Sequence, residues 1–160
     1  MARLVWLVTG CSSGLGQYLV KHIAARGDIA IATARDITKI SASVQSLENV
    51  SILPLDVNAP PPAIQDIIAQ AVSLHGHIDV LVNNAGFIQI GTLEELQYED
   101  WVAQFETNVF GPIKVAKAVL PHFRDRKSGT LAFVGSLSGW VGHEVCGAYA
   151  GSKFALEGEF

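Results

Sequence analysis

A tyrosine and a lysine four residues apart are the side chains of this sequence best suited to proton transfer. Tyr149 and Lys153 lie in the segment Tyr149-Ala150-Gly151-Ser152-Lys153, and this spacing places both on one face if the segment is helical. A phenol is a weak base at neutral pH, but a nearby ammonium favours its ionised form. The pair is therefore a candidate for general acid and base chemistry, although the same spacing is also common on ordinary helix surfaces.

A glycine-rich segment near the N-terminus could bind the phosphates of a nucleotide. Residues 9–16 have the sequence TGCSSGLG and follow a short apolar run. In such a turn Gly10 permits unusual backbone angles, Gly14 permits close approach of a phosphate, and Gly16 permits close packing of the next helix. Amides at the helix start would then face the phosphates. An ordinary tight turn between a strand and a helix could use the same glycines, so this pattern alone leaves both interpretations open.

The elements that must position these residues alternate between strands and helices. Short apolar runs bounded by Gly, Asn, Asp or Pro predict five strands, at residues 4–8, 29–34, 50–55, 78–82 and 130–134. Apolar residues at helical spacing predict helices within residues 15–23, 64–72 and 101–123. Pro112 should kink or split the last of these helices. Because alternating strands and helices form a parallel sheet through crossover connections, we expect the ligand site at the carboxyl ends of the strands.

The composition predicts one domain over residues 1–160 with a buried sheet. Of the 160 residues, 49% are hydrophobic and 16% are charged, which is more apolar than an average soluble domain and typical of a parallel sheet covered on both faces. Pro60, Pro61 and Pro62 indicate a turn before a helix and not a boundary between domains.

Charge and cysteine content narrow the function classes. The net charge of -4, without a dense cluster of Lys and Arg, argues against nucleic acid or an anionic membrane as the main partner. No stretch approaches the ~20 apolar residues of a membrane span. Two cysteines cannot build a disulfide framework, so a cytoplasmic location is expected. The histidines and cysteines have no metal-ligand spacing, so no metal is expected.

With Asn108 and Ser136 between them in the expected order, the glycine segment and the Tyr-x-x-x-Lys pair resemble the motifs of the short-chain dehydrogenase/reductase family. The resemblance covers the whole chain. It implies a Rossmann-type doubly wound parallel sheet in three α/β/α layers. It also implies an enzyme that transfers hydride between a nicotinamide cofactor and an alcohol or carbonyl substrate. The epimerase branch of this fold uses the same Tyr-x-x-x-Lys pair, but the T-G-x-x-x-G-x-G spacing argues against it.

The resemblance also implies roles for individual residues. Tyr149 would exchange a proton with the substrate oxygen, and Ser136 would polarise that oxygen. Lys153 would bind the nicotinamide ribose, and Asn108 would hold a water that links Lys153 to solvent. The cofactor contacts implied by the family are Gly10, Ser12, Ser13, Gly14, Leu15, Gly16, Arg35, Asp56, Val57, Asn83, Ala85, Gly86, Tyr149 and Lys153. Two of these contacts have alternative explanations. A turn role is nearly as plausible for the carboxylate in the pair Asp56-Val57. The family uses the two amides of Asn83-Asn84 to brace the sheet as well as to pack the adenosine ribose, so Asn83 is a support residue as much as a contact.

The expected choice between NAD and NADP depends on three residues at the end of the second predicted strand, Ala34-Arg35-Asp36. By the family's spacing, Ala34 occupies the acidic position of NAD-preferring members and Arg35 the basic position of NADP-preferring ones. An arginine can bind a 2′-phosphate in a bidentate manner. Asp36, however, lies about twenty residues after Gly16, as a ribose-binding carboxylate would. We expect NADP, with NAD as the second choice and a solvated loop without a binding role as the remaining alternative.

Members of the family are commonly longer than this chain, which ends seven residues after Lys153. We therefore expect the N-terminal two-thirds of a full domain, without the C-terminal strands and with an exposed edge at the fifth strand. Segments that enclose the nicotinamide and the substrate would be missing, so we expect weak or no turnover by this chain alone. A non-catalytic dinucleotide-binding module is the alternative function. The family further implies a small-molecule partner and association of two copies of the chain.

Overall fold

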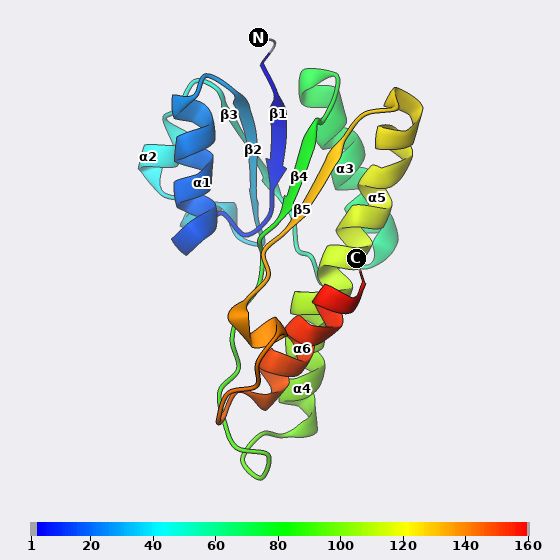
Figure 1. Ribbon diagram of the computed structural model, residues 1–160. Coiled ribbons are helices and arrows are strands. Elements are labelled where there is room, and N and C mark those ends of the chain that lie inside the picture. The colour runs from blue at the N-terminus through cyan, green and yellow to red at the C-terminus, as the bar shows by residue number, and fades with distance from the viewer. Residues whose placement is uncertain (1–2, 160) are drawn as a thin grey trace.

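The computed structural model describes residues 3–159, which form a five-stranded sheet with helices on both faces (Figure 1). The strands are β1 (Val5–Val8), β2 (Ile29–Ala34), β3 (Val50–Pro54), β4 (Val80–Asn83) and β5 (Thr130–Phe133). Their order is β3-β2-β1-β4-β5, and all four pairings are parallel. The order reverses between β1 and β4, which defines a doubly wound Rossmann-type sheet. The predicted fold class is confirmed, and β5 lies at one edge of the sheet as expected.

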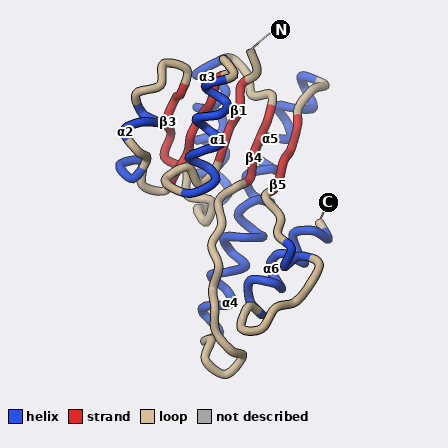
Figure 2. The backbone as a smooth tube through the Cα atoms, turned by 60° about the vertical axis from the view of Figure 1, so that its left-hand side comes forward, coloured by secondary structure: helices blue, strands red, loops and turns tan. Residues whose placement is uncertain are grey.

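The helices form the two outer layers. They are α1 (Gly14–Ala25), α2 (Ala42–Gln45), α3 (Pro61–His75), α4 (Tyr98–Phe105), α5 (Gly111–Arg126) and α6 (Gly147–Gly158). Two 3-10 turns, η1 (Ile37–Lys39) and η3 (Leu137–Gly139), follow β2 and β5. Figure 2 shows that α4 and α6 extend beyond the carboxyl ends of the strands, where the sequence predicts the ligand site. None of the helices in the described part of the chain has the length and apolar character needed to cross a bilayer.

Alternate residues of each central strand pack against different helical layers. Leu7 of β1 belongs to a buried cluster that includes Ile64 of α3 and Val115 of α5, whereas Val8 belongs to a second cluster that includes Val20 of α1. Because both faces of the sheet are buried, the strands are apolar at consecutive positions. This explains why short apolar runs located the strands correctly to within one or two residues.

The helix predicted over residues 101–123 is split, as Pro112 indicates. Between α4 and α5 lies η2 (Glu106–Phe110), a π-helical turn in which the Gly111 N–H donates to the Glu106 carbonyl. Pro112 has no N–H to continue a regular helix from the preceding turn. The close approach of Val57 also matters, because a Cβ at Gly111 would lie 2.9 Å from Val57 Cγ2. Such wide turns are frequent at functional sites, and this one contains Asn108.

Polar side chains tie the strands together at their amino ends, far from the glycine turn. The Asp79 carboxylate accepts hydrogen bonds from the Val5 N–H at 2.9 Å and from Arg126 Nη2 at 3.0 Å. Nε2 of His122 accepts a hydrogen bond from the Ile78 N–H at 3.1 Å. This bond occupies the Ile78 amide, which helps to explain why β4 begins at Val80 and not at residue 78 as predicted. It also requires a His122 ring whose Nε2 carries no proton.

The stability of the fold is expected to decrease as the pH falls from about 7 to about 5. Partial burial lowers the pKa of His122, and the Arg126 guanidinium acts in the same direction. A histidine with a lowered folded-state pKa contributes fully above its unfolded pKa of about 6.5, and this contribution is lost as the pH falls below that value. Denaturant unfolding at several pH values in this range should show that the free energy of unfolding falls less for His122→Gln than for the unmodified chain. Glutamine retains a hydrogen-bond acceptor and cannot titrate. Equal declines in both proteins would contradict this role of His122.

Candidate functional site

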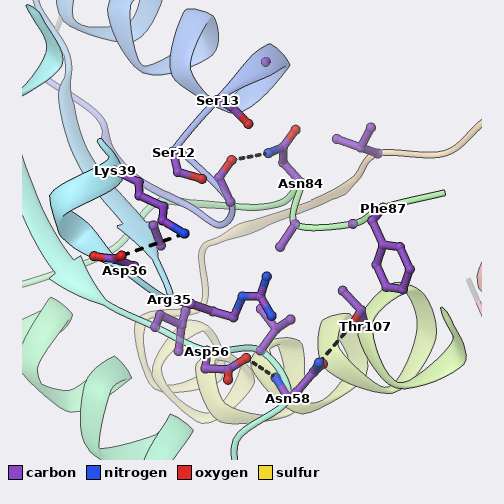
Figure 3. Close-up of a pocket in the computed structure, with 18 of the residues that line it drawn as sticks. Ser12, Ser13, Arg35, Asp36, Lys39, Asp56, Asn58, Asn84, Phe87 and Thr107 are labelled. Atoms are coloured by element: carbon purple, nitrogen blue, oxygen red, sulfur yellow. Dashed lines mark hydrogen bonds and ion pairs between the residues drawn. The ribbon is translucent and has the colours of Figure 1, made fainter. Parts of the chain in front are cut away.

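A cavity of about 670 Å³ lies at the carboxyl ends of the strands, beside the glycine turn (Figure 3). Its volume is within the usual range for small-molecule sites. The predicted cofactor contacts that line it are Gly10, Ser12, Ser13, Gly14, Leu15, Arg35, Asp56, Val57, Ala85 and Gly86. The sequence thus brings together residues from four strand ends. The other predicted contacts, which are found elsewhere in the described chain, are Gly16, Asn83, Tyr149 and Lys153.

The glycine turn combines positive φ angles, which glycine adopts readily, with close packing. Gly10 has φ +71°, and a Cβ there would lie 2.7 Å from Ala85 Cα. Gly14 has φ +54°, and apart from its chain neighbours and the backbone of its own helix no described atom lies within 4 Å of its Cβ position, so the space at the start of α1 stays open. A Cβ at Gly16 would lie 2.5 Å from the Gly10 carbonyl oxygen. Gly16 therefore packs helix α1 against the turn, and Gly14 leaves room for a ligand.

The start of α1 offers unpaired amides next to this open space. Ser13 occupies the N-cap position, and its side chain forms no capping hydrogen bond within residues 3–159. The first N–H groups of a helix have no partner inside the helix. They carry a partial positive charge, which suits the oxygens of a phosphate.

Thr9 and Asn84 attach the glycine turn to the end of β4. Thr9 is 1% exposed, and its Oγ1 accepts hydrogen bonds from the N–H groups of Asn84 at 3.0 Å and Ala85 at 2.9 Å. In return, Asn84 Nδ2 donates to the carbonyl oxygens of Thr9 at 2.8 Å and Gly10 at 3.1 Å. Four hydrogen bonds therefore fix the position of the turn relative to the sheet.

Asn83 and Asn84 differ in their side-chain contacts. Asn83 is 4% exposed, and its side-chain amide atoms have no hydrogen-bond partner among the described residues. It lies within β4, whereas its neighbour Asn84 lines the cavity and braces the turn. The side chain of Asn84 therefore braces the glycine turn, and the cofactor contact expected of Asn83 stays a prediction.

Arg35 and Asp36 occupy different places at the cavity. Figure 3 shows Arg35 extending across the cavity toward Asp56 and Asn58, while Asp36 lies at its edge. Asp36 caps the turn η1, where its Oδ1 accepts hydrogen bonds from the N–H and the hydroxyl of Thr38. These bonds, with a smaller effect of Lys39, hold the pKa of Asp36 below its usual range. The carboxylate of Asp36 is thus an ionised part of the turn.

Asp56 has the turn role considered for it, and its contact with an adenine stays a prediction. Its Oδ1 accepts a hydrogen bond from the Asn58 N–H at 3.0 Å, which stabilises the turn after β3. The same residue lines the cavity. Asn58 Nδ2 in turn donates to Thr107 Oγ1 at 2.9 Å, so the turn is also tied to η2.

Tyr149 and Lys153 lie on α6, and the Lys153 ammonium is 5.9 Å from the centre of the Tyr149 ring. Lys153 is 7% exposed and donates a hydrogen bond of 2.6 Å to the carbonyl oxygen of Val134, which lines the cavity. Burial lowers the pKa of Lys153, and Glu157 partly opposes this effect. Ser136 follows β5, and its Oγ accepts a hydrogen bond from the Ser138 N–H at 3.1 Å. That bond leaves the Ser136 hydroxyl proton available to a ligand.

Asn108 holds the segment that follows β4. It is 1% exposed, and its Oδ1 accepts a hydrogen bond from the Phe87 N–H at 3.1 Å, while its Nδ2 donates to the Phe87 carbonyl at 2.9 Å. Nδ2 also donates to Ser152 Oγ at 3.2 Å, and the Ser152 hydroxyl donates to the Tyr149 carbonyl at 2.7 Å. The side chain of Asn108 thus connects this segment to α6. A water held near Asn108, as the family implies, stays a prediction.

Gln104 has a similar role, which the sequence analysis missed. It is 0% exposed, and its Nε2 donates to the Phe87 carbonyl at 2.8 Å, while its Oε1 accepts from the Gln89 N–H at 2.7 Å. Gln104 and Asn108 therefore form a pair of buried amides that fixes the backbone of residues 87–89. The available signal was a second side-chain amide four residues before Asn108, which places both on the same side of a helix.

Two loops beyond the cavity expose several large apolar side chains. Phe87, Ile88, Ile90 and Leu93 belong to the loop after β4, and Leu137, Trp140, Val141 and Val145 lie between β5 and α6. The loops are joined by a hydrogen bond of 2.9 Å from the Gly91 N–H to the Val145 carbonyl. These apolar surfaces lie next to the segment that Gln104 and Asn108 hold, and they would favour a ligand with an apolar part.

Comparisons with known proteins agree with this arrangement. The chain matches the family described as short chain dehydrogenase over residues 4–159. The oxidoreductase YusZ of Bacillus subtilis (strain 168) is 37% identical over 164 residues, which cover 99% of this chain and 58% of YusZ. The crystal structure of a short-chain dehydrogenase from Streptomyces avermitilis superposes with a TM-score of 0.91 at 36% identity, covering 99% of this chain and 58% of that one.

A structure of ElxO with NADP bound is also similar, with a TM-score of 0.92 at 28% identity. The superposition covers 99% of this chain and 65% of ElxO. The chain therefore spans less than two thirds of the length of each of these three proteins.

Proposed function

This chain belongs to the short-chain dehydrogenase family, and on that premise we propose that it is the dinucleotide-binding part of an NADP(H)-dependent oxidoreductase. The reaction would interconvert an alcohol and a carbonyl compound. Residues 1–160 would form one nucleotide-binding domain. The observation that carries the proposal is the cavity beside the glycine turn, across which the guanidinium of Arg35 extends. The NADP bound to the similar protein ElxO supports the choice of cofactor.

The residues of the cavity fit a dinucleotide. The empty space around the Cβ position of Gly14 and the free amides at the start of α1 suit a pyrophosphate. Arg35 would bind the 2′-phosphate, and Asp56 with Val57 would contact the adenine. Ala85 and Gly86, which line the cavity after β4, would pack against the adenosine ribose. When bound, the nicotinamide ring supplies or accepts the hydride.

Tyr149, Lys153 and Ser136 would handle the proton of the substrate oxygen. Tyr149 would give its phenolic proton to that oxygen during reduction and take it back during oxidation. The ammonium of Lys153, held by the Val134 carbonyl at 2.6 Å, would favour the ionised form of the phenol. Ser136 would donate a hydrogen bond to the same oxygen and polarise it. The exposed apolar side chains of the two neighbouring loops suggest a substrate with an apolar part.

Titration of the purified chain with NADPH and NADH tests the cofactor assignment. We expect NADPH to bind more tightly, and Arg35→Ala to weaken NADPH binding by about 10- to 100-fold, because a charge-assisted hydrogen bond contributes about 1.5–3 kcal/mol. The affinity for NADH should change little. Arg26→Ala, at an exposed arginine paired with Asp28, is the matched control. Equal affinities of the unmodified chain for the two nucleotides, or no binding of either, would contradict the proposal.

A non-catalytic dinucleotide-binding module is the second candidate. A module of this kind would bind NADPH without oxidising it in the presence of any carbonyl compound. Because binding and turnover are measured separately, this outcome would leave the cofactor assignment intact.

A further inference from the structure

We propose that Lys39 binds the 2′-phosphate of the cofactor together with Arg35, and that Asp36 weakens this contact as a competing partner of the Lys39 ammonium. The inference rests on the proposed use of NADP(H). It adds a second cation to the phosphate site and gives Asp36 a role in cofactor choice that differs from binding the ribose.

The position of Lys39 is the first observation. Lys39 lines the cavity, as Arg35 and Asp36 do. Figure 3 shows its ammonium end directed into the cavity, between Ser12 of the glycine turn and the Arg35 side chain. Lys39 is the last residue of η1, and a 3-10 turn brings residues three apart onto the same side. The turn therefore places the ammonium beside Asp36 and near Arg35.

The present partner of Lys39 is a weak one. The Lys39 ammonium lies 3.9 Å from Asp36 Oδ2, and the two side chains are 74% and 47% exposed. Ion pairs with this exposure contribute little. The other carboxylate oxygen of Asp36 is already occupied by the N–H and hydroxyl of Thr38. Asp36 thus keeps its turn whether or not Lys39 remains beside it.

A phosphate would be the stronger partner for Lys39. A phosphate carries up to two negative charges and has three acceptor oxygens. The Asp36 carboxylate has one negative charge, and one of its oxygens already accepts hydrogen bonds from Thr38. Arg35 and Lys39 together bring two positive charges to this end of the cavity. The Asp36 carboxylate opposes them, both by attracting Lys39 and by repelling the phosphate. A ligand without the 2′-phosphate would leave the Lys39 and Asp36 pair as it is.

Two nucleotides that differ only in the 2′-phosphate test the inference without any enzymatic activity. Calorimetry on the full chain would compare adenosine 2′,5′-bisphosphate with adenosine 5′-monophosphate. We expect Lys39→Ala to weaken binding of the bisphosphate by about five- to tenfold and to leave the monophosphate unchanged. Lys117→Ala, at an exposed lysine on α5, is the control and should change neither affinity.

Asp36→Asn tests the second half of the inference. Asparagine retains an oxygen that can cap η1 but removes the negative charge. We expect this variant to bind the bisphosphate about five- to tenfold more tightly, with the monophosphate unchanged. Weaker binding of the monophosphate would instead assign Asp36 to the ribose hydroxyls and would overturn the inference. Thermal unfolding of each variant checks that the fold is retained.

The outcomes separate this inference from the proposed function. If Arg35→Ala weakens binding of the bisphosphate while Lys39→Ala does not, Arg35 binds the phosphate alone and the inference fails, although the use of NADP(H) stands. If the unmodified chain binds both nucleotides equally or binds neither, the assignment of NADP(H) itself fails.

Discussion

Replacing Gly10 with alanine is expected to remove dinucleotide binding and to destabilise the fold by about 3–5 kcal/mol. The residue has φ +71°, and its Cβ would lie 2.7 Å from the backbone Cα of Ala85. A backbone atom cannot rotate away as a side chain can, so the turn itself has to move. That movement would break the hydrogen bonds of Asn84 to Thr9 and Gly10. Denaturant unfolding and NADPH titration measure the two effects.

Substitutions at two other glycines distinguish the contribution of the backbone angle from that of the contact with Ala85. Gly27 has φ +84° and an open Cβ position, and it lies at the end of α1, away from the cavity. Gly27→Ala should cost about 1–2 kcal/mol from the backbone angle alone and should leave NADPH binding unchanged. Gly14→Ala should cost a similar amount of stability, because Gly14 has φ +54° and an open Cβ position. It should in addition weaken binding, because the methyl group occupies space beside the start of α1. If Gly10→Ala is no more destabilising than Gly27→Ala, the contact with Ala85 does not constrain the turn.

Replacing Tyr149 with phenylalanine is expected to slow hydride transfer by about 10²- to 10⁴-fold without changing the affinity for NADPH. The substitution removes only the phenolic oxygen, which we assign to proton exchange with the substrate. The aromatic ring and its packing on α6 remain, and Tyr149 lies outside the described lining of the nucleotide cavity. The effect should therefore appear in the chemical step and not in cofactor binding.

Single-turnover measurements suit this prediction, because they report the chemical step separately from substrate binding and product release. The oxidation of bound NADPH by an excess of a reactive apolar aldehyde would be followed for the unmodified chain, for Tyr149→Phe and for Tyr18→Phe. Tyr18 is an exposed tyrosine on α1 and serves as the control. Equal rates of NADPH oxidation in the unmodified chain and in Tyr149→Phe would contradict proton transfer by Tyr149. A complete absence of oxidation in all three would favour the non-catalytic module.

The sequence predicts the sheet well because each strand is a local pattern. The strands β1 and β2 have apolar residues at consecutive positions, and both faces of the sheet are buried. The glycine spacing in residues 9–16 likewise indicates a strand, a tight turn and a helix in that order. Both features are encoded by residues close together in the sequence, so they can be predicted without knowing which distant segments are in contact.

The exact roles of Asn83 and Asn84 could not be predicted in this way. Successive residues at a strand end point to opposite sides, and the residue at which β4 ends decides which amide faces the glycine turn. The strand ends one residue later than expected, at Asn83. Asn84 is then free to bond with Thr9 and Gly10. A shift of one residue in a strand boundary therefore changes the assignment.

Gln104 and Lys39 were missed for a different reason. The contacts of Gln104 are to the backbone of Phe87 and Gln89, which belong to a loop without a periodic pattern. Lys39 acquires its position through the short turn η1, which apolar spacing does not reveal. Both roles depend on how separate segments meet in space, and this information is absent from local sequence patterns.

The hydrogen bonds that hold residues 87–91 also limit how this loop can be redesigned. The backbone of Phe87 and Gln89 is bound by Gln104 and Asn108, and Gly91 is bound by the Val145 carbonyl. A loop transplanted here from a relative would keep its shape only if the amides at positions 104 and 108 were transferred with it. Changes to the exposed side chain of Ile88 or Ile90 leave these anchor points untouched. Those two positions are therefore the practical starting points for changing the apolar surface to which we assign substrate binding.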